Sequence, residues 1–194
     1  MMTFRRATIG DTLHLSRFVI MADGGCEEAL YDGLFPDQSI ESVLEPYYSQ
    51  SGTTDFHENH WIAEQDGQIA GALHAFPFDD YANDPPPDPR VPEERYAILK
   101  PFEDLPAPGT YFVNAISVYP EFCRRGIASS LLSLAFEHGK EAAFTEISLL
   151  VYGGNTGAVA LYEKRGFKVV GREPVVEHPL VRYTGEAYLM IASL

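Results

Sequence analysis

The chain has 194 residues, and its 28 acidic and 14 basic residues give it a formal net charge of −14. This length suits one domain with a substantial core. Hydrophobic residues make up 45% and charged residues 22%, which is ordinary for a soluble globular protein. The acidic balance argues against nucleic acid as a partner, because phosphate contact needs a basic surface. It suits a cationic or amine substrate, although acidic residues also simply keep a small protein in solution.

The sequence shows no sign of a membrane or secreted protein. No run approaches the roughly 20 apolar residues of a membrane span, and no apolar stretch follows Arg5 and Arg6 as in a signal peptide. We therefore expect a cytoplasmic protein. Cys26 and Cys123 have no metal-ligand spacing and are predicted to be free thiols, and no metal site is expected.

The first 76 residues predict an edge strand, three helices and a hairpin. Asp66-Gly67 between two apolar runs is a strong hairpin signal, because both turn positions need positive φ. The first helix is expected to begin after Asp11 and to stop before Gly24. The other ranges are 3–6 for the edge strand, 26–34 and 40–48 for the helices, and 60–64 and 69–76 for the hairpin strands.

Residues 77–108 form a proline-rich insertion. Its nine prolines exclude a regular helix or a central strand throughout, although 93–99 could still form a short helix. An irregular insertion of this length is usually a lid, a binding loop or a disordered segment. Because the flanking pieces look like halves of one sheet, we expect a single domain over 1–194 with an insertion, not two domains with a linker.

Strands and helices alternate from residue 109 onward, which is typical of an α/β sandwich. Strands are predicted at 111–118, 147–152, 167–170 and 186–191, and helices at 126–140 and 156–164.

The segment between the strand 111–118 and the helix that follows it could bind an anion. The free N–H groups in the first turn of a helix attract phosphate, and Gly126 has no Cβ to block its approach. Ala128 is the next smallest choice, and Arg124 and Arg125 add positive charge. Taken alone, this segment is also compatible with ordinary loop chemistry.

The helix 156–164 has a distinctive face. Asn155 can cap it and Gly166 can end it. Ala158, Leu161 and Tyr162 lie three and four residues apart, so they share one face, to which Tyr162 brings a hydroxyl group. Taken alone, this helix could also be a packed core helix.

Together, the two motifs resemble those of the GNAT superfamily of acyl-CoA-dependent N-acyltransferases. That family carries a pyrophosphate loop of the form Q/R-x-x-G-x-G/A, which this chain matches at Gly126 and Ala128. Cys123 stands where the family usually has Arg or Gln, and we expect only a modest loss, because the loop binds phosphate chiefly through backbone amides. The later helix has the form N-x-x-A-x-x-L-Y-x-K-x-G-F and matches at Asn155, Ala158, Leu161, Tyr162, Lys164, Gly166 and Phe167. The resemblance is close over 111–171 and looser over 3–76.

The resemblance implies acetyl-CoA as cosubstrate, an amine as acceptor, and one α/β (α+β sandwich) domain with a mostly antiparallel, bent central sheet flanked by helices. Many relatives are dimers, so a homodimer is expected too. Tyr162 would act as the catalytic acid that protonates the departing thiolate, and the N–H of Val118 would stabilise the oxyanion. The central strands would separate after Val118 to admit the pantetheine arm. The implied acetyl-CoA-binding residues are Ile116, Ser117, Val118, Arg124, Arg125, Gly126, Ile127, Ala128, Ser129, Asn155, Ala158 and Tyr162.

The general base and the acceptor stay open. Asn114 lies where a carboxylate would have been useful, but an amide is not a base at neutral pH, so a water relay is the default expectation. Other candidates for the base are His74, Glu64, Asp79, Asp80 and Glu186. The insertion is predicted to form the acceptor-side wall, where Asp79, Asp80, Asp84 and Asp88 could steer a cationic amine.

The alternative is a non-catalytic acyl-CoA-binding or sensing module of the same fold. Asn114 and Cys123 favour that alternative, whereas the intact Tyr162 argues against it. The acceptor and the acyl chain length do not follow from the sequence, because the fold does not determine the function.

Overall fold

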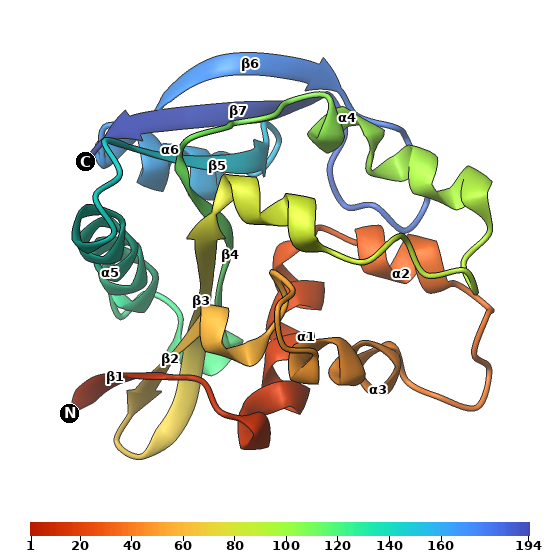
Figure 1. Cartoon of the computed structure of the whole chain (residues 1–194), viewed down its shortest axis with the longest axis horizontal. Helices are drawn as coiled ribbons and strands as arrows, with labels where there is room; N and C mark the ends of the chain where they lie inside the picture. Colours follow the sequence, from red (N-terminus) through yellow and green to blue (C-terminus); the bar gives the residue numbers. More distant parts are fainter.

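The computed structural model describes residues 1–194 and centres on a seven-stranded sheet (Figure 1). The strand order is β1-β2-β3-β4-β5-β7-β6, and all neighbours are antiparallel except β4 and β5. The strands are β1 (Met2–Arg6), β2 (His60–Gln65), β3 (Gln68–Pro77), β4 (Tyr111–Val118), β5 (Glu146–Tyr152), β6 (Lys168–Pro174) and β7 (Glu186–Ser193). The predicted fold class, an α/β domain with a mostly antiparallel sheet, is confirmed.

Helices cover both faces of this sheet, with α5 on one side and α1 to α3 on the other (Figure 1). Successive side chains of β2 point to opposite faces of the sheet, which explains both contacts. Trp61 and Ala63 are buried in the core that contains α5, whereas Ile62 packs with Leu15 and Phe18 of α1. The helices are α1 (Thr12–Ala22), α2 (Cys26–Tyr31), α3 (Ile40–Leu44), α4 (Lys100–Glu103), α5 (Ile127–Glu141) and α6 (Thr156–Lys164). None of them combines the length and the apolar character that crossing a membrane requires.

Local chain chemistry explains the element boundaries. The hairpin turns at Asp66 and Gly67, whose φ angles are 52° and 79°, as predicted. The predicted helix 40–48 is divided, because Pro46 lacks the N–H that would continue an α-helix. A 3₁₀ helix, Glu45–Ser49, therefore follows α3. The last two strands run past their predicted ends, since β6 pairs with β7 as far as Pro174 and β7 pairs with β5 as far as Ser193.

The insertion 77–108 packs on the side of the sheet that carries α1 to α3. It forms two 3₁₀ helices, Phe78–Asn83 and Glu93–Ile98, and the short α4. Arg95 donates hydrogen bonds from Nη1 to the carbonyl oxygens of Leu30 at 2.9 Å and Asp32 at 2.8 Å. The segment is thus held against α2 and the residue that follows it.

Candidate active site

The central strands β4 and β5 separate partway along the sheet. They pair only over Tyr111–Val113 and Ile147–Leu149. Asn114 is a bulge, because Val113 pairs with Ala75 and Ala115 with His74, which leaves Asn114 unpaired. The prediction that the strands separate after Val118 was wrong, since the bulge bends β4 away directly after Val113. The result is an opening between the second half of β4 and the end of β5.

Only some backbone groups of β4 face this opening. Tyr119 donates from its N–H to the carbonyl of Ala70 in the β3–β4 ladder at 2.9 Å. Strand alternation therefore turns the N–H of Ser117 toward β3 and those of Ile116 and Val118 toward the opening. The Ser117 hydroxyl also donates to a carbonyl of α1 at 2.6 Å. Ile116 and Val118 remain available to a ligand, whereas the N–H and hydroxyl of Ser117 are committed within the chain.

The loop before α5 forms a cradle of unpaired N–H groups, residues 124–129. None of these N–H groups donates a hydrogen bond within the chain, and the first satisfied amide is that of Ser130, at 3.0 Å from the carbonyl of Gly126. Gly126 caps α5 with a φ of 82°, and a Cβ built there would meet nothing within 4 Å. This combination fits an anion, because the donors are free and the space in front of Gly126 is open.

Two arginines add positive charge beside the cradle. Arg125 donates to the carbonyl of Glu121 at 2.9 Å and lies over the ring of Phe122, whereas the side chain of Arg124 makes no hydrogen bond. Both side chains are exposed. Cys123 lies at the rim, with its thiol 3.7 Å from the carbonyl of Val118. The charge, the free amides and the open space fit the pyrophosphate of CoA.

Helix α6 packs against the sheet but stays partly exposed to solvent. Asn155 accepts at Oδ1 from the N–H of Ala158 at 3.3 Å, while its Nδ2 donates to no group of the chain. No residue of α6 is fully buried, although Ala158, Leu161 and Tyr162 all pack against the core. The hydroxyl of Tyr162 has no hydrogen-bond partner, and burial raises the pKa of Tyr162 to about 12. The phenol is therefore protonated at neutral pH and free to donate.

Arg165, at the end of α6, joins this helix to α5. Its Nη1 donates to the carbonyl of Ser129 at 3.2 Å and its Nη2 to the hydroxyl of Ser133 at 2.9 Å. Its guanidinium carbon lies 5.5 Å from the centre of the Phe136 ring. Arg165 was not predicted as a site residue, because its position in the helix motif is one that accepts any residue.

Comparison with known proteins decides the family. Residues 27–167 match the model of the acetyltransferase (GNAT) family. The chain belongs to the GNAT family. The match covers both the amide cradle and α6, and it confirms the resemblance seen in the sequence.

Relatives of this GNAT chain are distant in sequence. Human N-acetyltransferase 8 is 24% identical over 133 residues, which are 69% of this chain and 46% of that protein. The chain thus spans about half the length of this curated relative. A solved N-acetyltransferase from Staphylococcus aureus Mu50 superimposes with a TM-score of 0.70 at 20% identity, covering 98% of this chain and 100% of that one. The NatC complex bound to Gag peptide and CoA superimposes with a TM-score of 0.56 at 16% identity, covering 100% and 98%. These two similarities show the fold.

On the other side of the opening, a buried histidine orients Asn114. His74 lies 2.9 Å from the carbonyl of Thr54 through Nε2 and 2.9 Å from the Asn114 amide nitrogen through Nδ1. Since a carbonyl only accepts, Nε2 carries the proton and Nδ1 accepts from Asn114. Tyr81 donates to the Asn114 carbonyl oxygen at 3.2 Å. Burial lowers the pKa of His74 to about 4, and both ring nitrogens are occupied, so the structure does not favour His74 as the base.

Most of the other predicted acidic residues accept hydrogen bonds from groups of the chain. Among the base candidates, Glu64 accepts from Arg5 at 2.7 Å, Asp79 from the Gly109 N–H at 3.1 Å and Glu186 from Arg172 at 3.4 Å. Of the predicted steering residues, Asp84 accepts from the Thr54 N–H at 2.7 Å and Asp88 from Tyr47 at 2.6 Å. Asp80 makes no side-chain hydrogen bond within the chain, and the water relay stays a prediction.

Three further carboxyl groups, those of Asp23, Glu27 and Asp55, are half-buried and were not predicted as site residues. Burial, before any neighbouring charge, raises the pKa of Asp23 and of Asp55 to about 6 and that of Glu27 to about 8. Nothing in the local sequence marks them, because segments distant in the chain bury them together.

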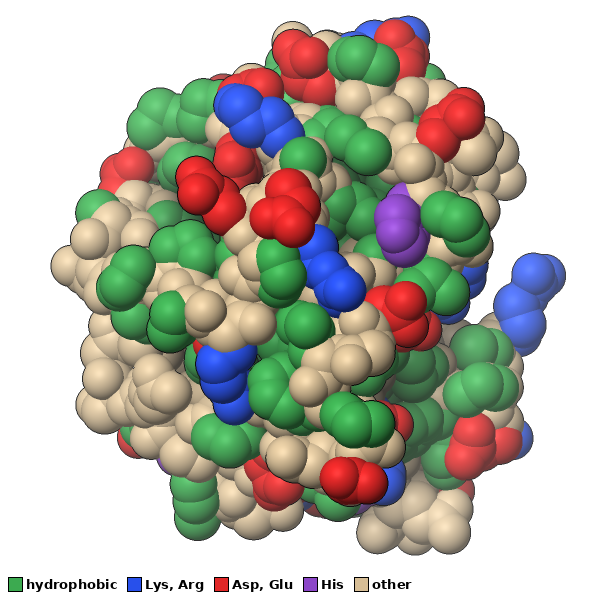
Figure 2. Space-filling model, turned by 90° about the vertical axis from the view of Figure 1, so that its right-hand side faces the viewer, with side chains coloured by type: hydrophobic (Ala, Val, Ile, Leu, Met, Phe, Trp, Pro, Cys, Tyr) green, Lys and Arg blue, Asp and Glu red, His purple; other side chains and the backbone are tan.

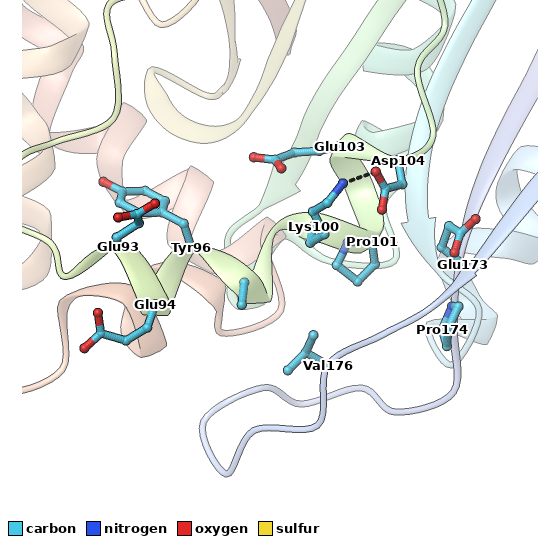
Figure 3. Close-up of a pocket in the computed structure, with 11 residues that line it drawn as sticks. Glu93, Glu94, Tyr96, Lys100, Pro101, Glu103, Asp104, Glu173, Pro174 and Val176 are labelled. Carbon is cyan, nitrogen blue, oxygen red and sulfur yellow. Dashed lines mark hydrogen bonds and ion pairs between the residues drawn. The ribbon is translucent and has the colours of Figure 1, made fainter.

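A separate hollow of about 900 Å³ lies between the insertion and the end of β6 (Figure 3). Glu93, Glu103 and Glu173 are among its walls, and Lys100 forms an ion pair with Asp104 across one side. No residue of the cradle, of α6 or of β4 lines it. The hollow is therefore distinct from the opening between β4 and β5.

Proposed function

We propose that this GNAT protein is an N-acetyltransferase that transfers an acetyl group from acetyl-CoA to a primary amine of a small molecule. Attack would be direct, within a ternary complex. The proposal is supported by the unpaired amides 124–129, which follow the open edge of β4 at Ile116 and Val118, and by the free hydroxyl of Tyr162 on α6.

The cradle and its neighbours would bind the cosubstrate. The amides 124–129, with Arg124 and Arg125, would hold the pyrophosphate, because free N–H groups and positive charge both favour phosphate oxygens. The backbone of Ile116 and Val118 and the Nδ2 of Asn155 would pair with the amides of the pantetheine arm. When bound, acetyl-CoA supplies an acetyl group that is activated as a thioester.

Two groups of the chain would then assist the transfer. Tyr162 would donate its phenolic proton to the sulfur that leaves, which its raised pKa and its lack of any other partner support. The N–H of Val118 would stabilise the negative charge that develops on the carbonyl oxygen. For the proton that the attacking amine must lose, we keep the water relay.

The amine would enter from the side of α1, α2 and the insertion. The face that carries α2, α3 and the insertion shows acidic side chains dispersed among apolar ones, with single basic residues between them (Figure 2).

A cytoplasmic location and a homodimer remain predictions.

The test measures the release of thiol from acetyl-CoA in the presence of polyamines, aminoglycosides, amino acids and peptides. Acetyl-CoA binding is measured in parallel by calorimetry. Turnover with one class of amine supports the enzyme. Tight binding of acetyl-CoA without turnover on any acceptor would favour the non-catalytic sensing module, and no binding would contradict the assignment of the cradle.

A further inference from the structure

The side chain of Asn114, at the point where β4 leaves β5, is fixed by two hydrogen bonds and is still exposed. Its Nδ2 donates to Nδ1 of His74 at 2.9 Å, and its Oδ1 accepts from the hydroxyl of Tyr81 at 3.2 Å. A carboxamide has two N–H donors and two lone pairs on its oxygen. Asn114 therefore keeps one N–H group and one lone pair that no group of the chain uses, and both are available to a ligand.

His74 determines which atom of this carboxamide takes which partner. His74 is 2% exposed, and its ring stacks on that of His60 with 3.9 Å between the ring centres. The carbonyl of Thr54, 2.9 Å from Nε2, keeps the ring proton on that nitrogen. Nδ1 can then only accept, so it holds the NH2 group of Asn114 and leaves Oδ1 to Tyr81. A carboxamide turned the other way would place two acceptors against each other at His74.

The insertion 77–108 fixes the groups that surround this carboxamide. Asp84 accepts at Oδ1 from the N–H of Thr54 at 2.7 Å and at Oδ2 from its hydroxyl at 2.5 Å. The N–H of Asp84 donates in turn to the carbonyl of Tyr81 at 3.1 Å. The ring of Tyr81 packs edge-on against those of Phe76 and Phe78, with 5.0 and 5.4 Å between the ring centres. One turn of the insertion therefore holds both Thr54 and Tyr81 in place.

We propose that Asn114 binds the acceptor amine through the free lone pair of Oδ1, and that His74 is the positioning residue for Asn114. The attacking nitrogen must keep its own lone pair free for the thioester carbon, so the group that orients it has to accept one of its N–H bonds. Oδ1 accepts such a bond, whereas an NH2 group in its place would occupy the lone pair that attacks. Asn114 orients the amine and takes no proton from it. This inference rests on the proposed acetyl transfer.

Two conjugates of CoA test the inference without depending on turnover. In the first, a CH2–C(=O) group joins the sulfur of CoA to butylamine as an amide, and in the second it joins the sulfur to butanol as an ester. The probes differ in one N–H group, which only the amide probe can donate to Oδ1 of Asn114. Calorimetry measures the Kd of each probe and of CoA alone.

The variants separate binding by Asn114 from positioning by His74. Asn114→Ala removes the carboxamide, and His74→Leu removes the group that holds it. His74→Gln keeps a donor and an acceptor at this position. Asn83→Ala is the matched control, because Asn83 is an exposed asparagine of the insertion whose side chain makes no hydrogen bond.

We expect the wild type and Asn83→Ala to bind the amide probe at least about fivefold more tightly than the ester probe. Asn114→Ala should lose this preference while its Kd for CoA stays within about twofold of the wild-type value. His74→Leu should lose the preference as well, because the carboxamide is then free to turn, and His74→Gln should recover most of it. NMR of the ring nitrogens of wild-type His74 should show a proton on Nε2 alone at pH 7.

Equal affinity of the wild type for the two probes, or a preference that survives in Asn114→Ala, would overturn the inference. A proton on Nδ1 of His74, or a full preference in His74→Leu, would overturn the positioning role. None of these results would contradict the proposed function, since that function is tested by thiol release and by the binding of acetyl-CoA itself.

Discussion

The amide nitrogen of Asn114 lies 2.9 Å from Nδ1 of His74, whose other ring nitrogen lies 2.9 Å from the carbonyl of Thr54. A doubly protonated ring could not accept from Asn114, so this arrangement requires a neutral His74. Because Asn114 is the bulge at which β4 leaves β5, the tautomer of a buried histidine sets the orientation of the amide at the opening.

The first prediction concerns stability against pH. The pKa of His74 is about 4 in the folded protein, against about 6.5 for an unperturbed histidine. Between these values His74 binds more protons in the unfolded chain, so its contribution to the free energy of unfolding falls by on the order of 3 kcal/mol as the pH drops from about 6.5 to about 4. Asp23 and Asp55, whose pKa burial raises to about 6, and Glu27, whose pKa it raises to about 8, act in the opposite direction, so the contribution of His74 is the difference between the wild type and a His74→Gln variant. Urea unfolding at several pH values measures the slope. His60, whose pKa burial lowers well below its ordinary value, adds to it in the same direction.

A His74→Gln variant should show a smaller slope than the wild type, because it carries no titrating ring at this position. His178→Gln is the control, since His178 is exposed. Equal slopes in His74→Gln and in the wild type would show that His74 is not held neutral.

The second prediction concerns the cradle. Gly126→Ala should weaken acetyl-CoA binding at least about tenfold, because the added methyl group enters the open space in front of the free amides. The positive φ should cost about 1 kcal/mol and lower the melting temperature by a few degrees. Gly33→Ala is the matched control, since Gly33 has a φ of 68° and equally open space but lies after α2. A similar loss of acetyl-CoA affinity in both variants would exclude a specific role for Gly126.

The third prediction concerns the contact between α5 and α6. Arg165→Gln should lower kcat/KM for acetyl transfer about threefold to tenfold, since α6 loses its hydrogen bonds to Ser129 and Ser133 and no longer holds Tyr162 firmly. Lys164→Gln removes a neighbouring charge that makes no hydrogen bond and should have little effect. Steady-state thiol release compares the two variants. An equal loss of kcat/KM in both variants would mean that the positive charge at this end of α6, and not the contact with α5, supports acetyl transfer.

Local features of this protein follow from its sequence, whereas features made by pairing distant segments do not. The hairpin at Asp66 and the cradle at Gly126 each depend on a few consecutive residues, and both were predicted. The bulge at Asn114 depends on how β4 pairs with β3, so the point of strand separation was misplaced. The burial that raises the pKa of Glu27 and of Asp55 depends on segments distant in the chain, so the local sequence does not mark these carboxyl groups.

The most direct test of the central claim is single-turnover thiol release by Tyr162→Phe, with the Kd for acetyl-CoA measured on the same preparation. Phenylalanine keeps the ring that packs near Phe167 and removes only the hydroxyl that would donate the proton. We predict that the rate falls at least about tenfold while the Kd changes by less than about twofold. Release at the wild-type rate would contradict the assignment of Tyr162 as the acid.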